Sequence, residues 1–174
     1  MSDDTTREAD VLVIGSGAAG LTAAVTAAVA GLRVIVAEKA PVFGGTTATS
    51  GGVIWIPMNR HAQALGRELG IDDSIDAARR YLRIECGQYI DEDRVEAYLD
   101  AGPKMVDFME RDTAVRFHAM EFPDYHPEEE GGSRIRSLGT MEDDARNMGP
   151  LMTRLKGELP QTLSSASRSA PRSR

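Results

Sequence analysis

The sequence predicts an α/β fold that begins with a parallel βαβ unit and continues mainly as helices. Two observations support this prediction: short apolar runs rich in β-branched residues at 11–14 and 34–37, and an Ala-rich stretch between them. This order is typical of parallel strands joined by a crossover helix. The 174 residues with 41% apolar content fit one domain with one core, which excludes collagen-like and wholly disordered chains.

The βαβ unit can be assigned residue by residue. A continuous β-branched run predicts a first strand at Val11–Ile14, buried on both faces. The helix is expected from Ala18 to Ala30, because its small residues permit close packing on a sheet, and Gly31 is its expected C-cap. The second strand is predicted at Val34–Ala37.

The rest of the chain predicts a long loop and then helices. Residues 41–57 are rich in Gly, Thr and Ser, which is typical of a functional loop. Amphipathic helices are expected at about Arg60–Leu69, from a cap at Asp73 or Ser74 to Cys86, at roughly Glu92–Ala101, and from Pro103 onward. The inward-facing residues of these helices are expected to be Ile75, Ala78, Leu82, Cys86, Met105, Phe108 and Met109. A short strand at Val115–His118 and a Pro- and Glu-rich loop at Phe122–Gly132 follow.

Charge and cysteine content exclude several classes of function. There are 20 Lys and Arg against 27 Asp and Glu, a net charge of -7, which disfavours binding to nucleic acid. A single cysteine, Cys86, excludes an internal disulfide and fits a reducing compartment. His61 and His118 have no ligand-like spacing, so no metal site is predicted. No secretory signal or transmembrane segment is visible, and a cytoplasmic protein is expected.

The turn after the first strand has the spacing GxGxxG, formed by Gly15, Ser16, Gly17, Ala18, Ala19 and Gly20. In a Rossmann-like unit these glycines permit a tight turn, close approach of a pyrophosphate and close helix packing. Glu38 ends the second strand, 18 residues after Gly20, where a carboxylate can accept hydrogen bonds from an adenosine ribose and disfavours a 2′-phosphate. The pattern predicts a dinucleotide and leaves NAD and FAD both open.

Residues 38–57 carry a resemblance that favours FAD. Glu38 and Lys39, followed by the run from Phe43 to Pro57, resemble the FAD-binding module of the fumarate reductase and 3-ketosteroid dehydrogenase flavoprotein superfamily. The part from Ser50 to Pro57 is most similar to the 3-ketosteroid Δ1-dehydrogenase branch. The resemblance implies that the loop wraps the pyrophosphate and approaches the flavin ring, with contacts from Gly44, Gly45, Thr46, Thr47, Ser50, Gly51 and Gly52.

Two further residues acquire roles from this resemblance. Gly45 stands where membrane succinate dehydrogenases carry a histidine bonded to flavin, so noncovalent FAD is expected. The segment from Phe122 to Glu128 resembles the active-site FPDYYP segment of the Δ1-dehydrogenases, which makes Tyr125 the candidate catalytic residue that assists a base. A tyrosine packed in a surface loop is the alternative. His126 stands where that branch often has a second tyrosine, and it is either a proton carrier or an exposed loop residue.

The resemblance also sets the expected organisation and function. We expect a flexible N-terminus at 1–9, the N-terminal part of an FAD-binding domain at 10–160, and a disordered Ser- and Arg-rich tail at 161–174. The superfamily's later parts, with its principal base and ketone-binding groups, have no counterpart in the sequence. The fold is therefore expected to be incomplete relative to the full flavoprotein fold, and we hypothesise a truncated or frameshifted product with an exposed apolar sheet face.

The predicted function is that of an FAD-dependent dehydrogenase of a 3-ketosteroid-like cyclic ketone, with hydride transfer to flavin N5 and a small-molecule substrate. The first alternative is a soluble fumarate reductase-like flavoprotein. It requires arginines for a dicarboxylate, and Arg134 and Arg136 form a close pair after the Tyr125 loop. The second alternative is a catalytically inert FAD-binding module. The sequence leaves the oligomeric state open.

Overall fold

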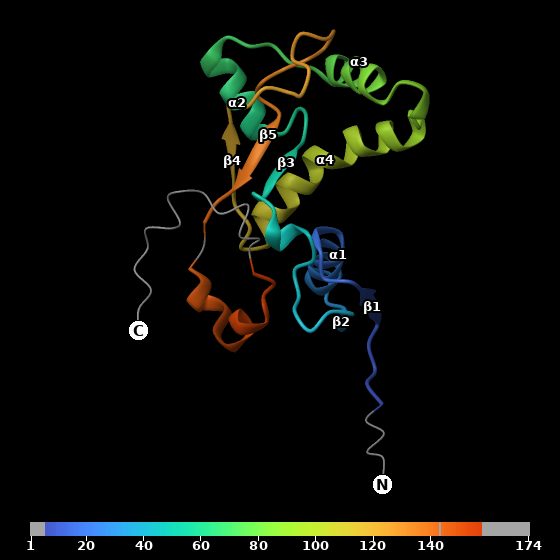
Figure 1. The fold of residues 1–174 in the computed structure, drawn as a ribbon, viewed down its shortest axis with the longest axis vertical. Coiled ribbons are helices and arrows are strands. Elements are labelled where there is room, and N and C mark those ends of the chain that lie inside the picture. The colour runs from blue at the N-terminus through green and yellow to red at the C-terminus, as the bar shows by residue number, and fades with distance from the viewer. Residues whose placement is uncertain (1–5, 143, 158–174) are drawn as a thin grey trace. The chain divides into compact units, whose positions relative to one another are not determined.

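The computed structural model describes residues 6–142 and 144–157. These residues form two compact units, which are described separately (Figure 1). The first unit takes its described residues from 6–52 and 144–157, and the second unit from 53–142. The predicted tail at 161–174 lies outside the described residues, as do the first five residues of the predicted flexible N-terminus.

The first unit contains the predicted βαβ elements, drawn in blue in Figure 1: β1 (Val11–Ile14), α1 (Ala18–Val29) and β2 (Val34–Ala37). The two strands are parallel, with Val11 opposite Val34 and Ile14 opposite Ala37. The predicted strands are confirmed, and α1 ends one residue earlier than predicted. A local signal sufficed here, because apolar runs and a glycine turn specify each element from neighbouring residues.

The prediction that the strands are buried on both faces is wrong for the described residues. Val13 is buried next to α1, but Leu12 is 62% exposed and Ile14 is 84% exposed. Helix α1 contacts both strands of this two-stranded sheet, and Leu12 and Ile14 lie on the face opposite Val13. The expected exposed apolar sheet face is therefore confirmed.

The segment 41–57 is only partly a loop. A short 3₁₀ helix, η1 (Thr47–Thr49), lies within it, and Phe43 forms a parallel bridge with Leu155, which directly follows η3 (Ala145–Arg154). The prediction of a continuous loop is wrong at β3 (Val53–Trp55), because these residues pair with a strand more than 80 positions later. Local patterns carry no information on such a distant partner.

The second unit contains three helices between residues 60 and 112. Helices α2 (Arg60–Leu69) and α3 (Ile75–Cys86) have the predicted bounds, and Ser74 is the N-cap of α3. On α3, Ala78 is buried as expected, while Ile75, Leu82 and Cys86 are half-buried. A 3₁₀ turn, η2 (Gly87–Tyr89), connects α3 to α4 (Glu92–Asp112).

Helix α4 corrects the prediction of two separate helices. It runs without a break through Pro103, which removes one backbone hydrogen bond and normally breaks a helix. Packing on both sides of the proline compensates, since Leu99 and Val106 are almost fully buried. Of the three residues expected to face inward after Pro103, Met109 is buried and Met105 and Phe108 are half-buried.

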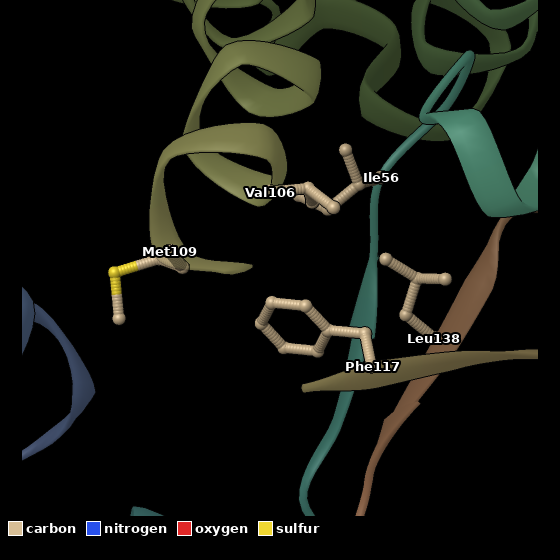
Figure 2. Packing of buried hydrophobic residues seen from close by; sticks show 5 residues of the cluster. All are labelled: Ile56, Val106, Met109, Phe117 and Leu138. Carbon is tan, nitrogen blue, oxygen red and sulfur yellow. The ribbon is translucent and has the colours of Figure 1, made fainter. Parts of the chain in front are cut away.

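A three-stranded antiparallel sheet completes the second unit, in the order β3, β5, β4. Strand β4 (Phe117–Met120) begins two residues later than predicted, and β5 (Ser137–Thr140) was not predicted. Figure 2 shows the core between this sheet and α4, where the buried side chains are Ile56, Val106, Met109, Phe117 and Leu138. The predicted loop at Phe122–Gly132 is confirmed, and it joins β4 to the segment before β5.

Candidate functional site

The turn between β1 and α1 brings the end of the strand and the start of the helix into close contact. Gly15 has a φ of 96° and donates its N–H to the carbonyl oxygen of Ala37 at 2.7 Å. A Cβ atom at Gly20 would lie 2.1 Å from the carbonyl oxygen of Gly15. No side chain fits there, so the contact between turn and helix requires glycine at this position.

The N-terminus of α1 is suited to an anion. Its N-cap, Gly17, provides no side-chain cap, and the first turn contains no acidic residue. N–H groups at such a terminus bind phosphate, helped by the helix dipole. The N–H of Ala18 donates to Thr47 Oγ1 at 3.0 Å, and Ala19 and Gly20 continue the same turn. The geometry therefore fits a phosphate group at the turn, with the hydroxyl of Thr47 at its edge.

A buried hydroxyl, that of Ser16, connects the three predicted parts of the cofactor site. Ser16 Oγ donates to Glu38 Oε2 and accepts a hydrogen bond from the N–H of Gly44 at 3.0 Å. The N–H of Ser16 also donates to the same carboxylate oxygen at 2.9 Å. The glycine turn, the acid after β2 and the following loop are thus held together by one residue that the sequence prediction did not assign a role.

The carboxylate of Glu38 is oriented and ionised. A hydrogen bond from the N–H of Ala40, followed by those from Ser16, lowers the pKa of Glu38 from 4.5 to about 2. An ionised carboxylate has roughly four acceptor positions, and these protein donors use most of them. A ribose hydroxyl would therefore donate to one of the acceptor positions that remain, on a carboxylate whose orientation is fixed by its hydrogen bonds with Ser16.

The structure brings only part of the predicted loop to the turn. A Cβ atom at Gly45 would lie 3.1 Å from Gly17 Cα, so the loop backbone closely approaches the turn. The hydroxyl of Ser50 bonds within the loop, as does the carbonyl of Thr46. Within the described part of the chain, no hydrogen bond joins Lys39, Gly51 or Gly52 to the turn. All of the predicted contacts with the cofactor stay predictions.

The second unit holds the candidate catalytic residue, Tyr125, at a cavity of about 470 Å³. The phenol of Tyr125 is 93% exposed and has no hydrogen-bond partner among the described residues. Most of the cavity wall is apolar, and a ligand bound there would contact aromatic and aliphatic side chains. The lining residues are Val53, Trp55, Tyr81, Leu82, Glu85, Met120, Phe122, Pro123, Asp124, Tyr125 and Ser137.

Three residues of the cavity wall, Trp55, Tyr81 and Asp124, contact a buried ionic cluster centred on Arg136. Its guanidinium is 0% exposed and pairs with Asp73 at 2.9 Å and with Asp124 at 2.9 Å. Asp124 also accepts a hydrogen bond from Trp55 Nε1 at 2.6 Å. The guanidinium carbon lies 5.5 Å from the Trp55 ring centroid and 5.8 Å from that of Tyr81. Two carboxylates therefore satisfy this charge, and the cluster fixes the residue before Tyr125.

A second polar group on the cavity wall was not predicted. Glu85, on α3, accepts a hydrogen bond from His126 Nδ1 at 2.6 Å. The hydrogen bond with His126, followed by that with Tyr81, lowers the pKa of Glu85, and the same contact with Glu85 raises the pKa of His126. The polar face of an amphipathic helix supplied no sequence signal that would distinguish Glu85 from other exposed acids.

No three His, Cys, Asp or Glu side chains within 6–142 and 144–157 are grouped as a metal site requires. Over the same residues, no helix is both long and apolar enough to cross a bilayer.

Comparison with known proteins shows the family. Residues 10–171 match the FAD binding domain family. The chain belongs to this family. The chain is 40% identical over 164 residues to a 3-oxosteroid 1-dehydrogenase of Mycolicibacterium smegmatis, covering 91% of the chain and 28% of that protein. It is 41% identical over 144 residues to a 4-oxocyclohexanecarboxylate 2-dehydrogenase of Sinomonas cyclohexanicum, covering 82% of the chain and 24% of that protein.

A solved structure also resembles this FAD binding domain. It is the 3-ketosteroid delta1-dehydrogenase of Sterolibacterium denitrificans, in complex with 1,4-androstadiene-3,17-dione. The TM-score is 0.80 at 36% sequence identity, over 91% of the chain and 28% of that structure. The chain thus spans about a quarter of the length of the relatives that it matches. The predicted resemblance to the FAD-dependent superfamily and its Δ1-dehydrogenase branch is confirmed.

Proposed function

We propose that this chain is the N-terminal part of an oxidoreductase that binds FAD noncovalently and dehydrogenates a cyclic ketone of the 3-ketosteroid kind. The observation that supports the substrate class is the cavity of about 470 Å³ beside Tyr125, whose wall is mostly apolar. Such a cavity suits the hydrocarbon rings of a steroid, while a free phenol at its edge can act on the polar end.

The residues of the first unit fit the dinucleotide part of FAD. The N–H groups of the α1 N-terminus would hold the pyrophosphate, and Glu38, oriented by Ser16, would accept from the ribose. Gly45 has no side chain that could bond to a flavin, which supports noncovalent binding. When bound, FAD supplies the hydride acceptor of the reaction.

Tyr125 is the proton-handling residue that this chain itself contributes. Its phenol oxygen has no competing partner among the described residues, so it is available to a ligand in the cavity. Dehydrogenation beside a ketone requires that a proton leave the adjacent carbon while a hydride leaves its neighbour. We propose that the Tyr125 hydroxyl assists the base that takes this proton, as a relay member rather than as the full base.

The charges around the cavity argue against a dicarboxylate substrate. The residues that line the cavity include the carboxylates of Glu85 and Asp124 and no Lys, Arg or His side chain. Arg136 is buried between two aspartates, and Arg134 pairs with Glu121 at 3.3 Å. The arginine pair that the fumarate reductase-like alternative requires is therefore already engaged, and a neutral ketone is favoured.

The FAD proposal is tested with the variant Gly17→Ala. A Cβ atom at Gly17 would have no neighbour within 4 Å, so the variant should unfold like the wild type. A bound pyrophosphate would meet that methyl group and would have to move away from the N–H groups of α1. The affinity for FAD should therefore fall by about tenfold or more, as expected for the loss of one strong polar contact. Flavin absorbance retained after desalting measures this. A monodisperse wild-type chain that retains no flavin would refute the proposal.

The substrate proposal is tested through the single tryptophan, Trp55, which lines the cavity. Addition of 1,4-androstadiene-3,17-dione should change its fluorescence in a saturable way, whereas succinate should not. Tyr125→Phe should weaken the response to the ketone without changing the unfolding midpoint, because the phenol is exposed. An equal response to succinate would favour the dicarboxylate alternative, and no response to either would support the inert module.

A further inference from the structure

The loop that carries Tyr125 is fixed on both sides of this residue. On the N-terminal side, Asp124 is buried, and its N–H donates to the carbonyl oxygen of Ser133 at 2.8 Å. Its carboxylate in turn accepts from the N–H of Ser133 at 2.9 Å and from Arg136. The backbone before Tyr125 therefore has one fixed position, set by the ionic cluster.

On the C-terminal side, His126 makes two contacts with α3. Its backbone N–H donates to the hydroxyl of Tyr81 at 3.2 Å, and its Nδ1 lies 2.6 Å from Glu85 Oε1. Tyr81 and Glu85 are four residues apart and thus share one helix face. The two contacts therefore join the residue after Tyr125 to one face of α3.

We propose that Glu85 and His126 are a positioning pair for Tyr125, in which their contact holds the loop on α3 and directs the phenol to the cavity. The inference rests on the role proposed above for Tyr125. His126 does not line the cavity, so it acts through its neighbour rather than on a ligand. This role explains why the backbone on both sides of Tyr125 is held by hydrogen bonds while its phenol has no partner among the described residues.

The charges that face His126 set the pH dependence of the pair. Glu85 and Tyr81 face it from α3, and Glu128 and Glu129 lie on its own loop. Contact with Glu85, and then the nearby acids, raises the pKa of His126. The contribution of the pair is therefore complete below the unfolded value, about 6.5, and is lost as the pH rises through the higher folded pKa. Arg80 and Glu130 form a separate, exposed ion pair between the same two elements.

Three variants of the 174-residue chain separate the possible roles. His126→Ala removes the contact with Glu85, whereas His126→Asn keeps a hydrogen-bond donor near the position of Nδ1 but cannot titrate. Glu130→Gln removes the exposed ion pair with Arg80 and is the matched control. The readout is amide ¹⁵N relaxation at Tyr125 as a function of pH, together with the ring shifts of His126.

The wild-type loop should be ordered at acid pH and become more mobile as His126 loses its proton. His126→Ala should be mobile at all pH values, His126→Asn ordered at all pH values, and Glu130→Gln identical to the wild type. In the Trp55 fluorescence titration, His126→Ala should bind the ketone about fivefold to tenfold more weakly, as expected for one lost charge-assisted hydrogen bond, and His126→Asn should restore most of the affinity.

The outcomes distinguish this inference from the proposed function. If the wild type binds no ketone, the proposed function fails, while the relaxation data still test the pair. If ketone binds and His126→Ala matches the wild type in both loop order and affinity, the pair has no positioning role. An unchanged mobility of Tyr125 across the His126 titration would equally overturn the inference.

Discussion

The two units of this chain are stabilised in different ways. The first unit has few buried apolar side chains among its described residues, Val13 and Ala24, and depends on contacts of glycine backbone and on the hydrogen bonds of Ser16. The second unit has a hydrophobic core between α4 and the antiparallel sheet (Figure 2). It also contains the buried ionic cluster of Arg136. The unit proposed to hold the cofactor thus depends mainly on polar and backbone contacts, whereas the unit with the cavity depends mainly on a packed apolar core.

Because of this difference, substitutions should have different effects in the two units. In the second unit, changes to buried groups should reduce global stability, because each is surrounded by packed side chains. In the first unit, changes should act locally on the turn and its ligand, because little apolar area depends on them. The predictions below test this separation, beginning with the largest effect.

Arg136→Leu should have the largest effect on folding. It leaves the carboxylates of Asp73 and Asp124 buried without a counter-charge. Loss of one partner from a buried ion pair costs about 3–5 kcal/mol of unfolding free energy. Denaturant unfolding followed by Trp55 fluorescence measures this loss. Arg134→Leu, at an exposed pair two residues away, is the control and should change the unfolding free energy by less than about 1 kcal/mol.

Gly20→Ala should be the most damaging substitution in the first unit. The added Cβ would overlap the carbonyl oxygen of Gly15, so the turn or the helix must move. Overpacking of this kind costs about 1–3 kcal/mol. Amide hydrogen exchange should report faster exchange in β1 and α1 and no change in β3 to β5. Equal acceleration in both units would show that they unfold together and would remove the distinction drawn between them.

The parts of the fold that could be predicted are those whose signal is local. The apolar runs of β1 and β2, the glycine turn and the caps of α2 and α3 each lie within a few residues of the element that they specify. Strands β3 and β5 were missed because they pair with each other across more than 80 residues. Helix α4 was divided at Pro103, because the burial of Leu99 and Val106, which compensates for the proline, is a tertiary effect.

The candidate site divides in the same way. Spacing located the turn and Glu38, and resemblance located Tyr125. Ser16 was overlooked although it occupies the second position of the glycine turn, because its role depends on the distance to Glu38 and Gly44 in space. Glu85 lies about forty positions from His126 and carries no motif, so only the folded structure brings the two together. The predicted cofactor contacts themselves await the binding experiments above.

Acid should affect the first unit through Glu38. Its folded pKa is lowered to about 2 by Ala40 and Ser16, so the stabilisation is present above about pH 4.5 and is lost as the pH falls through the folded value. In an NMR pH titration, the amide of Ser16 should shift with a midpoint near the folded pKa. Ser16→Ala should move this midpoint upward, because one donor to the carboxylate is lost. A wild-type midpoint at 4.5 would contradict the network, and Trp55 fluorescence serves as the control for the second unit.

The smallest effect on stability is expected at the exposed strand face. Ile14 is 84% exposed, so Ile14→Thr should change the unfolding free energy by no more than about 0.5 kcal/mol. Its neighbour Val13 is the matched control: Val13→Ala removes two buried methyl groups near α1 and should cost about 1–2 kcal/mol. Exposed apolar strands promote association, so Ile14→Thr should also reduce concentration-dependent self-association in sedimentation velocity. If Ile14→Thr were as destabilising as Val13→Ala, this face of the sheet would be covered in solution.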